Sequence, residues 1–415
     1  MQNDSVIVIG GGIVGIACAH YLVNDGHRVT VIDQAEIGKA CSHANCGFIC
    51  PSHVLPLTEP GAILDGFKSL LNPRAAFRIK PQLRLDLYQW MFQFLRRCTR
   101  TEMIRGGRCL LPLLESSMDE YHKLFAEFGS VGEWKENGLL YAFVSRAAFD
   151  KFARTDKMLS ETYGISARRI AGDELPEFDP AFRAELAGAF FYEDDGSVRP
   201  DKLVSDWRTR LAEAGVDFVE NCRLEQVRRS GDGIVALETT QGEKSADHYV
   251  FAMGAWSRLL AKELDCRIPV EPGKGYALTM SKPEVCPKHP MLCPEHRIGV
   301  TPFDDSYRLG SMMEFAGYDE SIPAWRMTQL CDSARPYLRM PAGEEVRETW
   351  YGWRPMTWDS LPIVGRVPGS DNGLLATGHN MLGLTLAPAT GRLIAELIRE
   401  RPTHIDIDAF SPDRF

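Results

Sequence analysis

The chain has 415 residues, of which 44% are hydrophobic and 25% are charged, and its formal net charge is -9. This length exceeds what one hydrophobic core usually supports, so we expect about two domains of ordinary globular composition. The acidic balance argues against a nucleic acid as partner, because a phosphate backbone is bound through a basic face.

The eleven cysteines are scattered, odd in number and match no zinc pattern. We therefore expect free thiols, no metal site and a reducing, cytoplasmic compartment. We expect neither a secretory leader nor a spanning helix, since no run reaches the ~20 apolar residues that a span requires. Residues 85–97 are aromatic, apolar and end in two arginines. A helix of this kind usually packs in a core, but it could lie peripherally on the inner face of the membrane.

In chain order, residues 5–9 are short and fully apolar, which predicts a strand buried on both faces. Residues 13–24 have helical apolar spacing, Gly26 ends that helix, and residues 28–33 predict a second buried strand. The N-terminus therefore reads as strand, glycine turn, helix and strand, which is one βαβ unit.

The remaining elements are predicted from composition and apolar spacing, with approximate boundaries. Residues 34–53 predict a loop and residues 60–100 proline-punctuated helical pieces. Helices are expected at 108–128, 147–164, 200–214, 322–338 and 384–399. Strands are expected at 138–144, from residue 188, in a series over 215–254, across most of 266–350, and at 372–377.

This order predicts an α/β (α+β) protein with a discontinuous, Rossmann-like domain. We assign residues 1–85, 200–265 and 350–415 to the nucleotide-binding domain. Residues 86–199 and 266–349 then form an inserted substrate-binding domain built on a large mixed β-sheet.

Gly10, Gly12 and Gly15 fit G-x-G-x-x-G between the first strand and the helix. Gly10 permits the tight turn, Gly12 the approach of a pyrophosphate, and Gly15 close helix packing, while the helix start favours the anion. Asp33 ends the second strand, where an acid can bind ribose hydroxyls. The motif alone does not decide between NAD and FAD.

Two further segments favour FAD. Ser42 and Asn45 lie in a polar loop after the βαβ unit, within reach of a second part of a long dinucleotide. Near the C-terminus "TGHNMLGLT" forms another glycine turn before a helix, whose N–H groups could stabilise negative charge on a reduced flavin ring.

Several stretches together resemble the FAD-dependent D-amino-acid oxidase superfamily, and within it most closely the bacterial D-amino-acid dehydrogenase small subunit. They are "VIVIGGGIVGIACAHYLVNDGHRVTVID", "SHANCGFICPSHVLPLTEPGAI", "PGKGYALTM", "YGWRPMTWDSLPIVGR" and "TGHNMLGLTLAPATGRLIAELI". The resemblance covers nearly the whole chain. It implies an FAD-binding domain with the substrate held between the flavin ring and a large mixed sheet.

The resemblance also implies which residues contact FAD. These are Gly10, Gly12, Ile13, Val14 and Gly15 at the pyrophosphate; Asp33 at the adenosine ribose; Ser42, Asn45 and Gly47 along the phosphates and ribityl chain; Val227 at the adenine; Ala252, Gly254 and Trp256 near the dinucleotide; and Gly378, Asn380, Met381, Leu382, Gly383, Leu384 and Thr385 at the isoalloxazine. Gln34 and Cys41 are further candidate cofactor contacts, although relatives often have a hydroxyl residue at the position of Cys41.

Amino-acid oxidation requires a carboxylate held so that the Cα–H points at flavin N5, and a bidentate arginine does this best. Arg354 in "YGWRPMT" stands in an aromatic, water-poor setting and is our candidate. Tyr276 could donate its hydroxyl to the same carboxylate, or be an ordinary strand tyrosine. By the resemblance His379 lies beside the flavin, where it could tune the ring or cap the helix.

The expected activity is FAD-dependent oxidative deamination of a D-amino acid to the 2-oxo acid and ammonia. Electrons would then pass to a quinone-linked acceptor or to oxygen. The alternatives are oxidation of a cyclic imino acid, such as a D-proline or hydroxyproline isomer, or of a secondary amine such as sarcosine. A non-catalytic flavin-binding subunit and a pyridine-nucleotide dehydrogenase also stay open.

Overall fold

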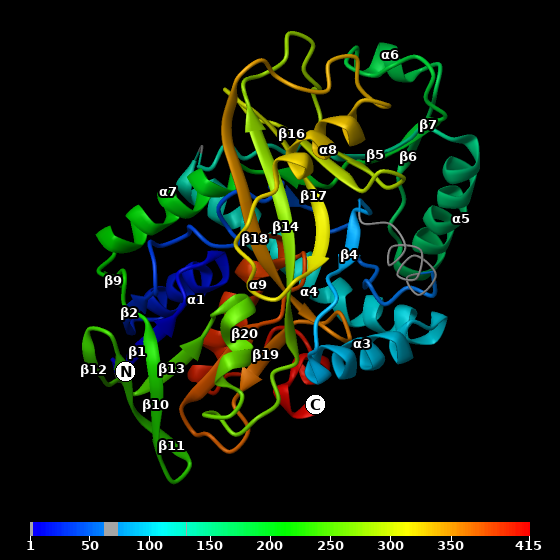
Figure 1. Cartoon of the computed structure of the whole chain (residues 1–415). Coiled ribbons are helices and arrows are strands. Elements are labelled where there is room, and N and C mark those ends of the chain that lie inside the picture. Colours follow the sequence, from blue (N-terminus) through cyan, green and yellow to red (C-terminus); the bar gives the residue numbers. More distant parts are fainter. Residues whose placement is uncertain (1–2, 62–73, 130) are drawn as a thin grey trace.

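The computed structural model describes residues 3–61, 74–129 and 131–415 (Figure 1). Its two principal sheets contain six and nine strands and lie side by side in the molecule. This α/β architecture with a large second sheet confirms the predicted fold class.

The six-stranded sheet draws its strands from three distant parts of the chain. Its order is β19-β20-β13-β1-β2-β9, and all neighbours are parallel except β19 and β20. The strands are β1 (Ser5–Ile9), β2 (Arg28–Ile32), β9 (Asp217–Val219), β13 (His248–Phe251), β19 (Ile363–Arg366) and β20 (Gly373–Thr377).

Alternate side chains of β1 enter two different hydrophobic clusters, as the pleat of a strand requires. Val6 and Val8 join the cluster on the helical face, whereas Ile7 and Ile9 join the cluster on the opposite face. The helical face is covered by α1 (Ile13–Asn24), α4 (Arg100–Phe128), α7 (Pro200–Glu213) and α9 (Gly383–Ile398). The other face is covered by β10 (Leu224–Ser230), β11 (Gly233–Thr239), β12 (Gly242–Lys244) and the 3-10 turn Gly254–Leu260.

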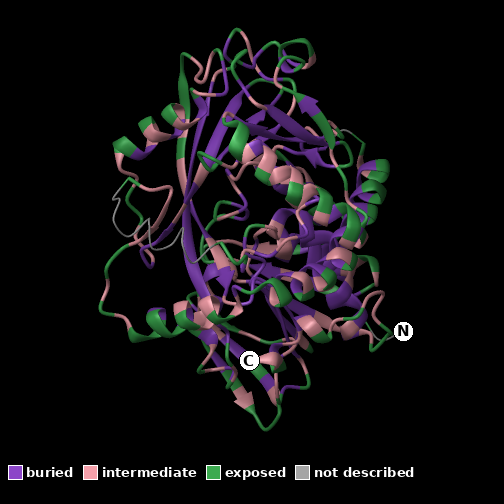
Figure 2. Ribbon diagram, turned by 90° about the vertical axis from the view of Figure 1, so that its right-hand side faces the viewer, coloured by how far each residue is buried: buried purple, intermediate pink, exposed green. Residues whose placement is uncertain are grey.

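The nine-stranded sheet has the order β18-β14-β17-β16-β15-β5-β7-β6, with β4 beside β17. Every residue of β14 is buried, and Figure 2 shows the long strands as a buried layer. The strands are β4 (Phe77–Ile79), β5 (Leu139–Phe143), β6 (Arg168–Ala171), β7 (Gly188–Tyr192), β14 (Val270–Met280), β15 (Met291–Cys293), β16 (Ile298–Pro302), β17 (Tyr307–Phe315) and β18 (Val346–Thr357).

Smaller elements complete this part of the molecule. Helix α8 packs on one face of the large sheet through buried Leu330 and Ala334. The two-residue strand β3 pairs with β8 and so joins the segment after the first βαβ unit to the turn that follows β7. The elements are α3 (Leu85–Arg97), α5 (Arg146–Tyr163), α6 (Leu175–Phe178), α8 (Ala324–Ala334), β3 (Phe48–Ile49) and β8 (Gly196–Ser197).

Most predicted elements are confirmed, and the differences have local causes. Helix α4 begins at Arg100 rather than near residue 108, because the Thr99 side chain accepts the Glu102 N–H at 3.2 Å and caps it. Strand β4 lies within residues 60–100, where helical pieces were expected, and residues 62–73 lie outside the described residues. Strand β18 keeps residues 350–357 in the large sheet, although the predicted division placed them with the nucleotide-binding domain.

Only one face of helix α3 packs in the core. Leu87 and Trp90 are its buried residues, and the Trp90 indole N–H donates to the Pro269 carbonyl at 2.9 Å. Tyr88 and Phe92 are exposed instead, with exposed fractions of 49% and 58%. The core interpretation is therefore wrong for this second apolar face. No helix in the described ranges is long and apolar enough to cross a membrane.

Candidate active site

The N-terminal glycine turn is packed against backbone on two sides. Gly10 has φ +109°, and a Cβ there would lie 2.5 Å from the Ala252 carbonyl oxygen. A Cβ on Gly15 would lie 1.9 Å from the Gly10 oxygen. Helix α1 has Gly12 as its N-cap, and Gly12 has no side chain to cap the helix. The helix dipole and the close backbone packing of these glycines suit an anion at this end of α1.

Asp33 and Ser42 brace this turn. The Asp33 carboxylate accepts the N–H groups of Gly11 at 2.7 Å and of Ala35 at 2.9 Å. Burial raises its pKa, and these two hydrogen bonds oppose the shift. The Ser42 hydroxyl accepts the Ile13 N–H at 2.9 Å. A carboxylate has further lone pairs, so Asp33 can still accept ribose hydroxyls.

The C-terminal glycine turn leads from β20 into α9. Gly378 has φ +71°, and a Cβ there would lie 2.7 Å from Thr357 Cγ2. The Asn380 amide joins the turn to β18, because its oxygen accepts the Thr357 N–H at 2.9 Å and its nitrogen donates to the Gly378 carbonyl at 2.9 Å. The N-cap of α9 is Leu382 and no side chain caps the helix, so a second set of N–H groups is open.

His379 lies behind that turn. Its Nε2 hydrogen-bonds the Thr390 hydroxyl of α9 at 2.9 Å, and the residue is buried. Burial lowers its pKa to about 3, so the imidazole stays neutral at physiological pH. His379 therefore supports α9 and has no charge with which to act on a substrate; a role beside the flavin stays a prediction.

The segment of residues 41–50 connects both sheets. The Arg308 guanidinium on β17 donates to the Asn45 carbonyl at 3.0 Å, and the Thr301 hydroxyl on β16 donates to the Cys46 carbonyl at 2.5 Å. From the other side the Thr385 hydroxyl of α9 contacts the Phe48 carbonyl at 3.3 Å. The segment is thus held between the large sheet and the second helix start.

Gly47 allows the bend in this segment. It has φ +74°, and a Cβ would lie 2.0 Å from the Val198 carbonyl oxygen. Its N–H donates to the Asn45 side-chain oxygen at 2.8 Å. Asn45 and Gly47 therefore shape the segment that the resemblance places along the cofactor.

Arg354 lies on the face of the large sheet that this segment covers. In the register of β14 with β18, Arg354 pairs with Gly273 and Gly352 pairs with Gly275. A Cβ on Gly275 would be 2.3 Å from Arg354 Nη1, so the guanidinium lies directly over the strand. Nη1 donates to the Met312 carbonyl at 2.7 Å. Met312 has φ +73° and falls in a register shift between β14 and β17, which turns this carbonyl toward the arginine.

Arg354 is a cation that no carboxylate of the described residues neutralises. It is half-buried, and burial lowers the pKa of its guanidinium, while the Cys41 and Cys46 thiols nearby oppose the shift. A buried cation of this kind requires an anionic partner.

The structure does not bring Tyr276 to Arg354, so the expected two-residue clamp needs correction. Tyr276 pairs with Tyr351, three positions along the strands from the Gly273–Arg354 pair. Because side chains alternate along a strand, this odd offset places Tyr276 on the opposite face of the sheet from Arg354. There its hydroxyl donates to Glu314 at 3.0 Å, within the cluster under α8. The sequence does not predict the register in which two distant strands pair, and so it does not predict which of their side chains share a face of the sheet.

Several other residues predicted to contact the cofactor have partners within the protein. The Val227 N–H donates to the Glu263 carboxylate at 2.7 Å, and the Gly254 carbonyl accepts the Thr377 hydroxyl at 3.1 Å. The Trp256 ring packs edge-on against Trp353, with 5.4 Å between ring centroids. Gln34 and Met381 are exposed. The roles of these residues at FAD stay predictions.

Sequence reasoning missed Gly275, Met312, Cys46 and Arg308. The repeated glycines of "PGKGY" were the available signal for Gly275. Two histidines of the loop before and after β3 also have hydrogen-bond partners. His43 Nε2 lies 2.7 Å from Glu348, and His53 Nδ1 lies 3.0 Å from the Tyr141 hydroxyl.

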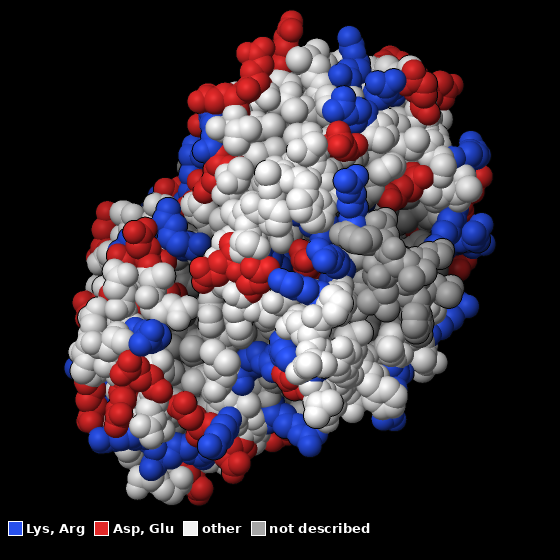
Figure 3. Space-filling view, viewed as in Figure 1, with Lys and Arg blue, Asp and Glu red and all other residues white. Residues whose placement is uncertain are grey.

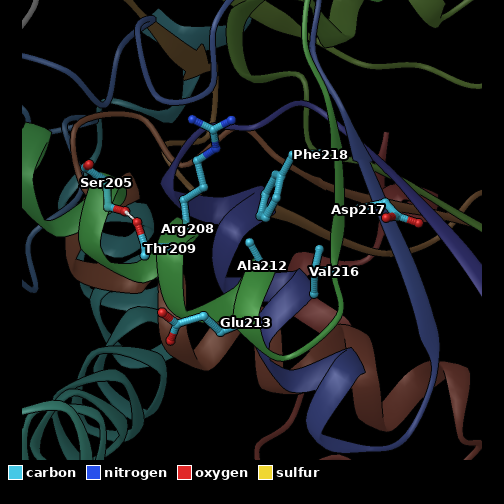
Figure 4. Close-up of a pocket in the computed structure, with 8 residues that line it drawn as sticks. All are labelled: Ser205, Arg208, Thr209, Ala212, Glu213, Val216, Asp217 and Phe218. Atoms are coloured by element: carbon cyan, nitrogen blue, oxygen red, sulfur yellow. Dashed lines mark hydrogen bonds between the residues drawn. The ribbon is translucent and has the colours of Figure 1, made fainter.

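One surface hollow lies away from these residues. It lies between α7 and the edge strand β9, and Figure 4 shows Arg208 and Phe218 at its wall. Arg208 is paired with Glu220 at 3.2 Å, and none of the predicted site residues lines the hollow. Within the described ranges no group of three His, Cys, Asp or Glu side chains could hold a metal, and all eleven cysteines are free.

The sequence matches known proteins over its full length. The family profile described as FAD dependent oxidoreductase matches residues 5–397. A protein named D-amino acid dehydrogenase from Methylobacterium nodulans is 34% identical over 424 residues, which cover 99% of each chain. One of the same name from Neisseria meningitidis serogroup A is 30% identical over 418 residues, again 99% of each chain.

Solved structures share the fold at lower identity. Glycine oxidase from Geobacillus kaustophilus superposes with a TM-score of 0.81 at 22% identity, covering 99% of both chains. L-proline dehydrogenase from P. horikoshii superposes with a TM-score of 0.73 at 20% identity, covering 100% of this chain and 98% of that chain.

Proposed function

Because this chain belongs to the family of FAD-dependent oxidoreductases, we propose that it oxidises a D-amino acid to the 2-oxo acid and ammonia. Family membership decides for FAD over a nicotinamide cofactor. The name shared by relatives that are about 30% identical over the full length supports a D-amino acid as the substrate.

The residues present fit FAD. The glycine-lined start of α1 suits a pyrophosphate, and Asp33 at the end of β2 suits a ribose. The uncapped start of α9 suits the electron-rich edge of the ring. When bound, FAD supplies a two-electron acceptor that takes up the hydride from the substrate Cα.

One observation carries the substrate class: the half-buried, carboxylate-free guanidinium of Arg354. One Nη is held by the Met312 carbonyl, and the remaining donors can form a charge-assisted pair with a substrate carboxylate. A carboxylate fixed in this way aligns the Cα–H bond. The amine lone pair then forms the C=N bond as the hydride leaves, and water hydrolyses the imine to the 2-oxo acid and ammonia.

Anaerobic bleaching of the flavin tests this proposal. We expect the holoenzyme to lose its oxidised-flavin absorbance with one or more D-amino acids and to keep it with the L-enantiomers. D-Proline, hydroxyproline isomers, glycine and sarcosine complete the panel. Bleaching by these alone would replace the D-amino acid with a cyclic or secondary amine, and no bleaching by any of them would refute amino-acid oxidation.

For the electron acceptor we propose a lipid-dissolved quinone reached through α3, which holds the second apolar face described above. Leu85, Tyr88 and Phe92 are spaced three and four residues apart and share one side of α3, with exposed fractions of 87%, 49% and 58%. The Arg96 guanidinium lies 5.8 Å from the Phe92 ring centroid. Figure 3 shows uncharged surface in this region with Lys and Arg at its borders. An apolar helix face beside basic groups suits an anionic membrane surface.

Vesicle flotation tests this contact. We expect the holoenzyme to float with vesicles that contain anionic phospholipid and to do so less when Phe92→Glu is introduced. Val235→Glu is a matched control, because Val235 is also exposed but lies on β11. Equal flotation of both variants and the parent would exclude α3 as the contact.

A further inference from the structure

Helix α9 contains a proline that breaks its own hydrogen-bond ladder. Pro388 lies inside Gly383–Ile398 and has no N–H, so the Leu384 carbonyl one turn earlier loses its partner within the helix. Leu384 belongs to the first turn of α9, which is the turn whose N–H groups are open at the candidate active site. A proline there would leave a buried carbonyl without a donor.

Helix α4 supplies the missing donors. The Tyr121 hydroxyl donates to the Leu384 carbonyl at 2.7 Å. The Ser117 hydroxyl, one turn earlier on α4, donates to the Thr385 carbonyl at 2.6 Å and accepts the Ala389 N–H at 3.4 Å. Both side chains have an exposed fraction of 0%. Two hydroxyls from a neighbouring helix therefore replace the hydrogen bonds that Pro388 disrupts.

Tyr121 is held rigidly for this task. Its ring is stacked on Phe125 with 5.4 Å between centroids and on Trp134 with 6.4 Å. Burial raises the pKa of its hydroxyl, which therefore remains a donor at all working pH values. Thr385, next to the repaired carbonyl, also contacts the Phe48 carbonyl at 3.3 Å. The same turn thus fixes part of the segment beside Arg354.

We propose that Tyr121 is a positioning residue, which fixes the first turn of α9 and thereby sets the affinity and reduction potential of the bound flavin. The inference rests on the proposed location of FAD at the start of α9. The aligned N–H groups there stabilise negative charge, so they favour the reduced, anionic cofactor more than the oxidised one. Loss of the Tyr121 donor lets the Leu384 peptide turn toward another partner and misaligns these groups.

The test uses Tyr121→Phe, Pro388→Ala and the double variant. We expect Tyr121→Phe to weaken binding of oxidised FAD about three-fold and of reduced FAD about thirty-fold. This ten-fold difference lowers the two-electron potential by about 30 mV. In the double variant the alanine that replaces Pro388 restores the N–H that the Leu384 carbonyl needs, so we expect both affinity and potential to return. Pro388→Ala alone keeps both values within about two-fold of the parent.

Tyr163→Phe is the control, because the Tyr163 hydroxyl also donates to a helix carbonyl, that of Ile104 at 3.2 Å, but away from α9. We expect an unchanged potential for this variant. An unchanged potential in Tyr121→Phe, or no rescue in the double variant, would overturn the inference. Binding and potential are measured by titration with FAD and a chemical reductant, without an amino acid. Failure of this test is therefore distinct from failure of the proposed substrate class.

Discussion

Gly275 leaves room for the guanidinium of Arg354 to lie flat on β14. The space that a side chain would fill at this position is taken by the arginine, since a Cβ would approach Nη1, Cζ and Nη2 to 2.3, 2.6 and 2.6 Å. The Met312 carbonyl then fixes one edge of the fork. A strand glycine and a bulge together set the direction in which the charge points.

We predict that Gly275→Ala lowers kcat/KM for the amino-acid substrate about 10–100-fold, because the displaced guanidinium loses charge-assisted hydrogen bonds. FAD binding stays unchanged, since Gly275 is on the large sheet. Steady-state kinetics and flavin titration check this. Gly233→Ala on β11 is the control, because the nearest atom to its Cβ would be 3.7 Å away. A variant with parental kinetics would show that the arginine does not need this position.

We predict that Arg354→Lys raises KM and lowers kcat together, with a combined loss of about 10–100-fold in kcat/KM. Lysine keeps the charge but not the planar fork, so the carboxylate is bound without being oriented. Steady-state kinetics and flavin content measure the two effects. Parental KM and kcat in a variant with full flavin content would remove Arg354 from substrate binding.

At the scale of elements, the turn after β7 holds the segment that follows β3. Asp195, with an exposed fraction of 0%, accepts the Ser52 N–H at 3.0 Å and the Ser52 hydroxyl at 2.6 Å. Burial raises its pKa to about 7, and the neighbouring Asp194 adds to the shift. A carboxyl buried in this way makes the stability of the fold depend on pH.

We predict that the contribution of Asp195 to the free energy of unfolding falls as the pH rises from about 4 to 7, and that it is read as the difference between the parent and Asp195→Asn. Below that window Asp195 is protonated in both the folded and the unfolded state. Within it only the carboxyl of the unfolded chain ionises, so the rising pH stabilises the unfolded state relative to the folded one. The Asp195→Asn variant lacks this loss, which between about pH 5 and 8 is on the order of 2 kcal/mol. Denaturant unfolding of the parent and of Asp195→Asn at about pH 5 and pH 8 measures this difference in the free energy of unfolding. Parallel pH dependence in the two proteins would contradict it.

The sequence predicted elements well but not their mutual registers. Gly10, Gly15 and Asp33 were predictable because their spacing lies within one βαβ unit, where every contact is local. Arg354 was identified from its aromatic neighbours and the family resemblance. Its relation to Tyr276 was not predictable, because it depends on whether β14 and β18 pair in even or odd register across the long segment that separates them.

At the scale of the molecule, Arg308 joins parts of the chain that are far apart. It has an exposed fraction of 1%, and its Nε donates to the Thr279 hydroxyl at 2.9 Å while Nη1 donates to the Asn45 carbonyl at 3.0 Å. Its Nη2 lies 3.6 Å from Asp201 on α7 and 3.9 Å from Glu348 on β18. One side chain therefore connects the large sheet, the segment over it and a helix of the other unit.

We predict that Arg308→Met destabilises the protein by about 2–4 kcal/mol, because it leaves the buried Asn45 carbonyl and the Thr279 hydroxyl without their donor and removes a cation near Asp201 and Glu348. It also weakens FAD binding, since the segment of residues 41–50 loses an anchor. Thermal unfolding with and without FAD checks both effects. Arg347→Met is the control, because Arg347 is 39% exposed and its partners are on the surface. Equal unfolding temperatures in the two variants would refute this role.

The discontinuous architecture was predictable as a pattern, because the strands at both ends of the chain are short, apolar and next to glycine turns. The contribution of α4 to the start of α9 was not predictable. Tyr121 lies 263 positions before Leu384, and nothing local in either segment indicates that the tyrosine compensates for Pro388. The domain boundaries remain predictions, apart from the observation that β18 runs to Thr357 within the large sheet.

Strand β18 is the outermost member of the large sheet, and it carries Arg354 as its ninth residue. One residue inserted in the strand before Arg354 would move its side chain to the opposite face of the sheet, and a second inserted residue would move it back. An insertion or deletion of one codon before Arg354 would therefore remove its side chain from the candidate active site, whereas a change of two codons would keep it on the same face.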